Sequence, residues 1–333
     1  MNLKKTVLLA LLLLFALIYF SPQSNEDDIA GVNEVKEEEF EDGTTEENLS
    51  LSRDLGYYMN TLLDTHTWLL KNNEMEFDQQ VDRLKRFFIV QKGEDLFIRW
   101  TIKEETSANG LADDIRIIKA LYKAADQFDR PDYKELADKL ASTINKTQQI
   151  QGVYTDYTDW AFNEPAKRVT LSELVPDLFT LLNQTGQTEE VLKNAKEYGV
   201  FFPEFYDLES QQYKWGYDIY MEEQLRIAIN RQRIGQPSLA FQTWIMSEWD
   251  KRGKIPVRYI RTTRFPAVEE ESLEVYLYLA EYFRLIKKDQ YAKVVETYVY
   301  KLIDEKRLKL VHFFEWQLYE VMKESHKEDI STT

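Results

Sequence analysis

The stretch DDIRIIKALYKAADQF (residues 113–128) carries apolar side chains at helical intervals. Ile115, Ile118, Leu121, Ala125 and Phe128 fall on one face, because residues three or four positions apart lie on the same side of a helix. The stretch is therefore predicted to form an amphipathic helix that packs this face against a core.

The same period recurs along the chain and predicts ten or eleven helices, mostly in antiparallel pairs with short connections. The other expected helices lie at 52–71, 77–88, 129–144, 172–184, 188–198, 221–230, 237–251, 270–286, 289–303 and 313–323. Short aromatic and β-branched pieces separate them and are expected to form loops or small hairpins on one rim of a helical toroid. These rim pieces are LFIRW (96–100), VYTDYTDW (153–160), FFPEFYD (201–207), QYKWGYD (212–218) and IPVRYI (255–260).

The first 20 residues read as a targeting segment. Lys4 and Lys5 precede fifteen uncharged residues, Thr6 to Phe20, and bulky side chains at 18–20 leave no clear cleavage site. An uncleaved signal anchor is favoured over a cleaved signal peptide. In the first case residues 6–20 hold the protein in the membrane with the domain outside the cell; in the second the protein is secreted.

Residues 21–47 are predicted to form a disordered acidic tether. They carry eleven acidic residues and one base, Lys36, so the first 47 residues account for −8 of the total net charge of −16. The remaining domain, 48–333, is mildly acidic and has no basic stripe, which argues against a nucleic-acid partner.

The residue inventory excludes several kinds of site. The chain has no cysteine, so disulfides, thiolate metal sites and a lipid-modified N-terminal cysteine are excluded. The three histidines, His66, His312 and His326, show no i, i+4 spacing. We therefore expect neither a metal site nor a cofactor.

The rim pieces are rich in tryptophan, tyrosine and aspartate. Aromatic planes cover the apolar faces of a sugar ring, and carboxylates accept hydrogen bonds from its hydroxyls. Hydrolysis of a glycosidic bond also needs two carboxyl groups, one protonated and one ionised. A carbohydrate is thus the expected ligand, although amphipathic aromatics also cap ordinary helical cores.

The order of five segments resembles glycoside hydrolase family 8, in particular its exopolysaccharide-associated bacterial branch. They are SRDLGYYM (52–59), LFIRW (96–100), ADDIRIIKAL (112–121), YKWGYDIYMEEQLRIAI (213–229) and AVEEESLEVYLYLA (267–280), followed by HFFEWQLYEVM (312–322). The resemblance implies an all-α (α/α)6 barrel over about residues 50–325. It also implies hydrolysis, with inversion, of a β-linked polysaccharide.

The resemblance assigns roles to individual residues. Asp114 corresponds to an aspartate that holds the sugar at the cleavage point, and Asp218 to the general base. The residues expected to bind substrate are Tyr57, Trp100, Asp113, Trp215, Tyr217 and Glu222. Simpler explanations are a helix-start charge pair for Asp113 and Asp114, a helix cap for Asp218, and an i, i+4 ion pair between Glu222 and Arg226.

The general acid of the family falls on Arg53, which cannot donate a proton at ordinary pH. Asp54 is the nearest carboxyl group, although one residue along a helix usually changes the face. Three interpretations stay open. In the first, the chain is a hydrolase whose acid has moved, to Asp54 as first choice or to Glu46 or Glu47 at the end of the tether. In the second, it is a barrel that binds a glycan without cutting it. In the third, it is a helical-repeat protein scaffold. The sequence does not indicate the oligomeric state.

Overall fold

The computed structural model describes residues 49–63, 73–305, 307–308, 314–320 and 322–323. The targeting segment expected at 1–20 and the acidic tether expected at 21–47 lie outside the described residues. Within the described part, no helix combines the length and apolar character needed to cross a membrane.

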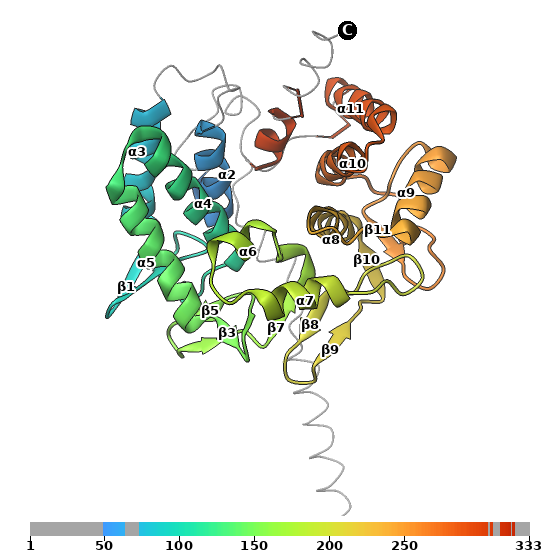
Figure 1. The fold of residues 1–333 in the computed structure, drawn as a ribbon. Helices are drawn as coiled ribbons and strands as arrows, with labels where there is room; N and C mark the ends of the chain where they lie inside the picture. The colour runs from blue at the N-terminus through green and yellow to red at the C-terminus, as the bar shows by residue number, and fades with distance from the viewer. Residues whose placement is uncertain (1–48, 64–72, 306, 309–313, 321, 324–333) are drawn as a thin grey trace, which may run out of the picture. The chain divides into compact units, whose positions relative to one another are not determined.

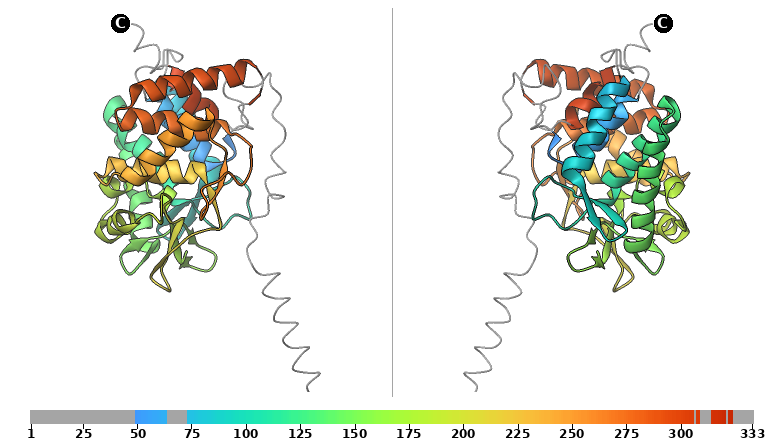
Figure 2. Two further views of the ribbon diagram at one scale, coloured as in Figure 1. Left: turned by 90° about the vertical axis from the view of Figure 1, so that its right-hand side faces the viewer. Right: turned by 90° about the vertical axis from the view of Figure 1, so that its left-hand side faces the viewer.

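Inner and outer helices alternate along the chain (Figure 1). The inner helices are α2 (Ser52–Leu62), α4 (Leu111–Phe128), α6 (Asp177–Leu181), α8 (Met221–Arg233) and α10 (Leu273–Leu285); residues 314–320 are also helical. The outer helices are α3 (Asn73–Arg83), α5 (Pro131–Thr147), α7 (Gly186–Asn194), α9 (Leu239–Arg252) and α11 (Asp289–Asp304). Figure 2 shows them from the side, with α11 (red) along the top. The predicted all-α (α/α)6 barrel is confirmed.

The distribution of apolar residues explains which helices lie inside. On α10 nine residues are buried, including the unbroken run from Val275 to Ala280, so this helix is covered on nearly every side. On α5 the buried residues, among them Tyr133, Ala137, Leu140 and Ile144, follow a single face. A helix with one apolar face packs against a neighbour and leaves its other face in water, as an outer helix does.

Side-chain caps fix the start of two helices. The Ser272 hydroxyl accepts a hydrogen bond from the Glu274 backbone N–H at 3.2 Å, and Ser238 accepts from Phe241 at 3.1 Å. The outer helix α9 ends at Gly253, whose φ of 63° a glycine adopts without steric cost. The Ser272 cap places Glu274 in the first turn of α10.

The helix expected at 172–184 is divided in the structure. A short 3-10 helix, η5 (Leu171–Glu173), precedes α6, which begins only at Asp177. Pro176 lies between them, and proline lacks the backbone N–H that a continuous helix needs. The division leaves Glu173 at the end of η5, on the inner side of the ring.

The rim pieces form short antiparallel strands, as predicted. The strand pairs are β1 (Ile89–Lys92) with β2 (Asp95–Ile98), β3 (Gln149–Ile150) with β4 (Val153–Tyr154), β5 (Thr158–Asp159) with β6 (Glu164–Pro165), and β10 (Asp218–Tyr220) with β11 (Arg258–Ile260). A three-stranded sheet contains β7 (Arg168–Thr170), β8 (Phe205–Asp207) and β9 (Gln212–Lys214). A π-helical turn, η4 (Leu84–Phe88), leads from α3 into β1.

Candidate active site

A cavity of about 250 Å³, called the central cavity below, lies where inner helices begin. The first turns of α2, α4 and α10 contribute to it, together with η5 and the second turn of α8. Its lining residues are Arg53, Tyr57, Gly110, Leu111, Ala112, Asp113, Arg116, Asp156, Glu173, Arg226, Glu274, Tyr278 and Phe314. Helix N-termini carry partial positive charge, so this end of the ring favours acidic side chains.

Two ion pairs line the central cavity, one within α4 and one between η5 and α8. The Arg116 Nη1 lies 2.6 Å from Asp113 Oδ1, and the Arg226 Nη2 lies 2.8 Å from Glu173 Oε1. Arg226 therefore pairs with a carboxylate of another element, rather than with Glu222 one helical turn away as the sequence suggested. The Arg116 guanidinium also stacks on the Tyr57 ring, 4.7 Å from its centre.

The pKa values of Glu173 and Glu274 are shifted in opposite directions, although both residues line this cavity. Burial raises the pKa of Glu173, but the charges of Arg226, Arg116 and Arg53 outweigh it and leave the pKa below its ordinary value. Burial also raises the pKa of Glu274. There Arg226 and Arg53 oppose the effect only partly, and the negative charge of Glu173 adds to it, so this pKa stays above the ordinary value. The cavity thus brings together one carboxyl group whose pKa is lowered and one whose pKa is raised.

Arg53, which the resemblance places at the position of the general acid, is one of the residues that line the cavity. Its guanidinium carbon lies 3.9 Å from the centre of the Phe314 ring, and its Nε lies 3.7 Å from Asp54 Oδ1. Asp54 itself is buried and is not among the cavity-lining residues. Burial raises its pKa to about 6, against the opposing charge of Arg53. Asp54 therefore holds a proton more readily than an ordinary aspartate but does not face the cavity.

Asp113 and Asp114 occupy different environments. Asp113 lines the cavity and accepts a 3.4 Å hydrogen bond from the Ser52 hydroxyl as well as the Arg116 contact. Asp114 is only 2% exposed, and its Oδ2 accepts a hydrogen bond from Asn109 Nδ2 at 2.7 Å. That amide also donates to Gln148 at 2.6 Å, so Asp114 belongs to a buried polar network beneath the site.

The other predicted site residues lie outside the lining of the central cavity. Trp100 is 49% exposed and lies next to the start of α2, because its backbone oxygen accepts a hydrogen bond from Ser52 N at 3.0 Å. Asp218 lies on β10, 3.6 Å from Arg258, and makes no capping bond to α8, whose N-cap is Tyr220. Tyr217 is 75% exposed beside it.

Trp215, between β9 and β10, and Glu222, in the first turn of α8, are both partly buried. The Trp215 indole N–H is buried and has no hydrogen-bond partner among the described residues. Burial raises the pKa of Glu222 to about 7, and the nearby charge of Glu274 contributes to this increase. Of the nine predicted site residues, the structure thus places Tyr57 and Asp113 on the central cavity.

Sequence reasoning did not identify Glu173 and Glu274 as site residues. Glu274 does carry a sequence signal, because it follows Ser272 at the capped start of a helix in the segment EEESLEVYLYLA (269–280). Glu173 is the second residue of the helix expected at 172–184, and nothing in that pattern marks it as a site residue. Within the described residues, no cluster of histidine, aspartate and glutamate has the arrangement of a metal site.

Comparisons with known proteins agree with this fold. The "Putative lipoprotein YdaJ" of Bacillus subtilis (strain 168) is 30% identical over 257 residues, which cover 74% of this chain and 67% of the relative. The crystal structure of PssZ from Listeria monocytogenes matches with a TM-score of 0.73 and 28% identity, over 82% of this chain and 85% of that chain. A novel alpha-amylase from Clostridium perfringens matches with a TM-score of 0.70 and 19% identity, over 82% and 86% of the two chains.

Several β-glucanases share the fold at only 11–13% identity. No family model matches the sequence. The identity to YdaJ and its coverage establish a family relationship, and the structural matches agree with the (α/α)6 architecture of this chain. The chain therefore belongs to the family of YdaJ, and its (α/α)6 fold is the one that the resemblance to glycoside hydrolase family 8 implies.

Proposed function

We propose that the protein is a glycoside hydrolase that cuts an extracellular β-linked polysaccharide, such as an exopolysaccharide or a cellulose- or chitosan-like glycan, with inversion. The observation that carries this proposal is the pairing of Glu173 and Glu274 in one cavity with pKa values moved in opposite directions. Inverting hydrolysis requires one carboxylic acid and one carboxylate across the scissile bond.

In this mechanism Glu274 donates its proton to the leaving glycosidic oxygen as the C–O bond breaks. Glu173, kept ionised by Arg226 at 2.8 Å, accepts a proton from the water that attacks the anomeric carbon. Asp113 and Tyr57 line the same space and are positioned to contact the sugar hydroxyls and ring. These assignments replace Asp218 and Asp54, which do not line the central cavity.

The test is a reducing-sugar assay on a panel of soluble β-glycans. Removing the proton donor with Glu274→Gln should lower the rate by about 10²-fold or more. Glu270→Gln, a change at an exposed glutamate of the preceding segment, is the matched control and should retain full activity. Equal activity of the wild type and Glu274→Gln on a substrate that the wild type cleaves would exclude Glu274 as the acid.

A second candidate function is glycan binding without cleavage, and Arg53 favours it. An arginine at the position of the family's acid cannot donate a proton, and here it is fixed between Phe314 and Asp54. If the wild type binds β-glycans without releasing reducing ends, and Arg53→Glu produces measurable hydrolysis, the binding function replaces the hydrolase.

We infer that the domain lies outside the cytoplasmic membrane, held by residues 6–20 or released when they are cleaved. The two lysines before an uncharged segment support this orientation, as does the name of the relative, "Putative lipoprotein YdaJ". Because this chain lacks cysteine, its anchor would differ from a lipidated cysteine. Protease added to intact cells should degrade the domain, whereas full protection would contradict this topology.

A further inference from the structure

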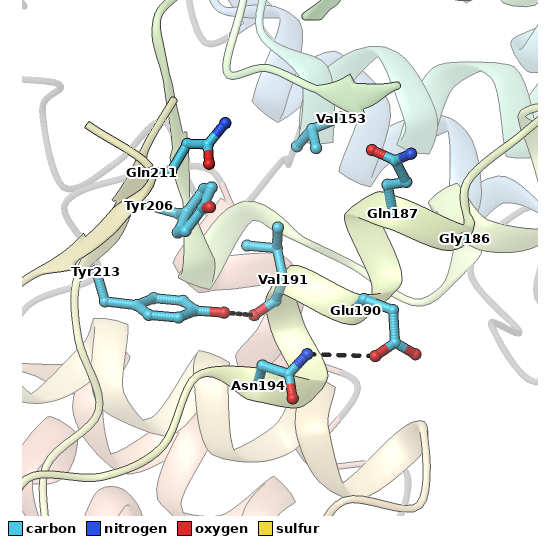
Figure 3. A pocket seen from close by; sticks show the side chains of 9 residues that line it. All are labelled: Val153, Gly186, Gln187, Glu190, Val191, Asn194, Tyr206, Gln211 and Tyr213. Carbon is cyan, nitrogen blue, oxygen red and sulfur yellow. Dashed lines mark hydrogen bonds between the residues drawn. The ribbon is translucent and has the colours of Figure 1, made fainter. Parts of the chain in front are cut away.

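A second cavity, of about 490 Å³, lies between α7 and the hairpin of β8 and β9 (Figure 3). It is called the Tyr206 cavity below. Its polar lining comes from Gln187, Glu190 and Asn194 of α7 and from Tyr206, Gln211 and Tyr213 of the hairpin. In the part of the chain that the structure describes, it shares no lining residue with the central cavity, so a ligand bound here would leave the central cavity accessible.

The chemistry of the Tyr206 cavity suits an uncharged, hydroxyl-rich ligand. Two tyrosine rings offer apolar faces with hydroxyl tips, and three amide side chains both donate and accept hydrogen bonds. Among the described residues, no cationic side chain lines it, and the one carboxylate in its lining, Glu190, already accepts a hydrogen bond from Asn194 at 3.2 Å. An anionic ligand would therefore find no counter-charge in the lining.

Contacts to the rest of the domain hold Tyr206, Tyr213 and the end of α7 in place. The Tyr213 hydroxyl donates to the Val191 carbonyl at 2.7 Å, as Figure 3 shows, and the Tyr206 and Tyr213 ring centres lie 4.9 Å apart. Arg231 of the inner helix α8 donates to the carbonyl of Lys193 at 3.0 Å and also to that of Leu192. The end of α7 is thereby fixed to the ring, and the cavity is largely pre-formed.

Two hairpin tips bring glutamines to the edge of the cavity. Gln151 and Gln211 have φ values of 52° and 54°, in the left-handed region where glycine would be less strained. The Gln211 Nε2 donates to Gln151 Oε1 at 3.3 Å across the two tips. At Gln211 this conformation keeps an amide side chain on the cavity wall, which glycine could not supply.

We propose that the Tyr206 cavity is a second glycan-binding site, which takes uncharged sugar units of the polysaccharide. This inference rests on the proposed function for the identity of the polymer. A long chain would be held at two places on one domain, which raises its local concentration at the central cavity. Short oligosaccharides, which occupy only one site, would gain nothing from it.

The experiment measures binding of the full-length protein to mixed-linkage β-glucan and hydroxyethyl cellulose by affinity gel electrophoresis, beside hydrolysis of both polymers. Tyr206→Ala, and separately the exposed pair Gln187→Ala with Gln211→Ala, should weaken binding by about tenfold. Gln212→Ala, at the neighbouring exposed glutamine outside the cavity, is the matched control and should bind as the wild type does. The double glutamine variant keeps the test valid if Tyr206→Ala does not fold.

The outcomes separate this inference from the proposed function. Unchanged binding by both sets of cavity variants, no binding of either neutral polymer by the wild type, or binding of anionic polysaccharide alone would each overturn the second site. Hydrolysis that still depends on Glu274 would then leave the proposed function standing. Conversely, absent hydrolysis with a binding loss confined to the cavity variants would reject the hydrolase and keep the second site.

Discussion

The Arg53 guanidinium lies over the Phe314 ring at 3.9 Å and joins the first turn of α2 to the helical residues 314–320. The same side chain approaches Asp54 Oδ1 at 3.7 Å. One arginine thus makes a cation–π contact with an otherwise distant part of the chain and balances the charge of a buried carboxylate.

Replacing Arg53 with alanine should lower the free energy of unfolding by about 1–2 kcal/mol, mainly through loss of the cation–π contact. It should also raise the pKa of Asp54 above about 6, because the nearest positive charge is gone. Urea unfolding measures the first effect, and an NMR titration of the Asp54 carboxyl measures the second. Lys103→Ala, at an exposed position, serves as the control; a variant at Arg53 as stable as this control would show that the stacking contributes little.

Asp54 should make the domain less stable as the pH rises. Its pKa is about 6 in the folded protein and 3.8 ordinarily, so between these values the folded state binds more protons and stability falls with increasing pH. The full effect, up to about 3 kcal/mol, is present above pH 6. Asp54→Asn should remove this component, so the stability difference between pH 4 and pH 8 should shrink. An identical difference in wild type and variant would contradict the raised pKa.

The two carboxyl groups of the central cavity predict a bell-shaped pH dependence of kcat/KM. Its acidic limb reports protonation of Glu173 and its alkaline limb reports ionisation of Glu274. Arg226→Gln removes the main counter-charge of Glu173, raises that pKa and should move the acidic limb to higher pH. Arg226→Lys keeps a positive charge and should move it less. An acidic limb that stays in place in Arg226→Gln would assign it to another group.

Gly216 should tolerate no side chain. A Cβ atom there would lie 2.2 Å from Glu204 Oε1 and 2.8 Å from the Asp218 backbone oxygen, and the backbone atom cannot rotate away. Gly216→Ala should therefore destabilise the domain by about 1–3 kcal/mol. Gly186→Ala, where a Cβ would meet nothing within 4 Å, should leave the melting temperature unchanged. Equal melting temperatures for the two variants would mean that this loop relaxes freely.

The helices were predictable because their period is a local property of the sequence, as in residues 113–128 of α4. The side chains that face the cavity were harder to predict. Adjacent residues on a helix point about 100° apart, so Asp113 reaches the cavity while Asp114 contacts Asn109. The role of Glu173 depends on Arg226, a partner from a different helix that only the folded ring brings near. Local pattern thus determined the scaffold, and long-range packing determined which of its carboxylates share a site.

The five inner helices α2, α4, α6, α8 and α10 each carry an acidic residue in their first turn. Helix starts are equivalent positions of a repeated scaffold, so an acid lost at one of them can be replaced at another without rebuilding the ring. Arg53 on α2 and Glu274 on α10 fit such an exchange. Under the proposed function, the proton donor lies at the start of α10 instead of the start of α2, and the architecture of the ring is the same with either arrangement.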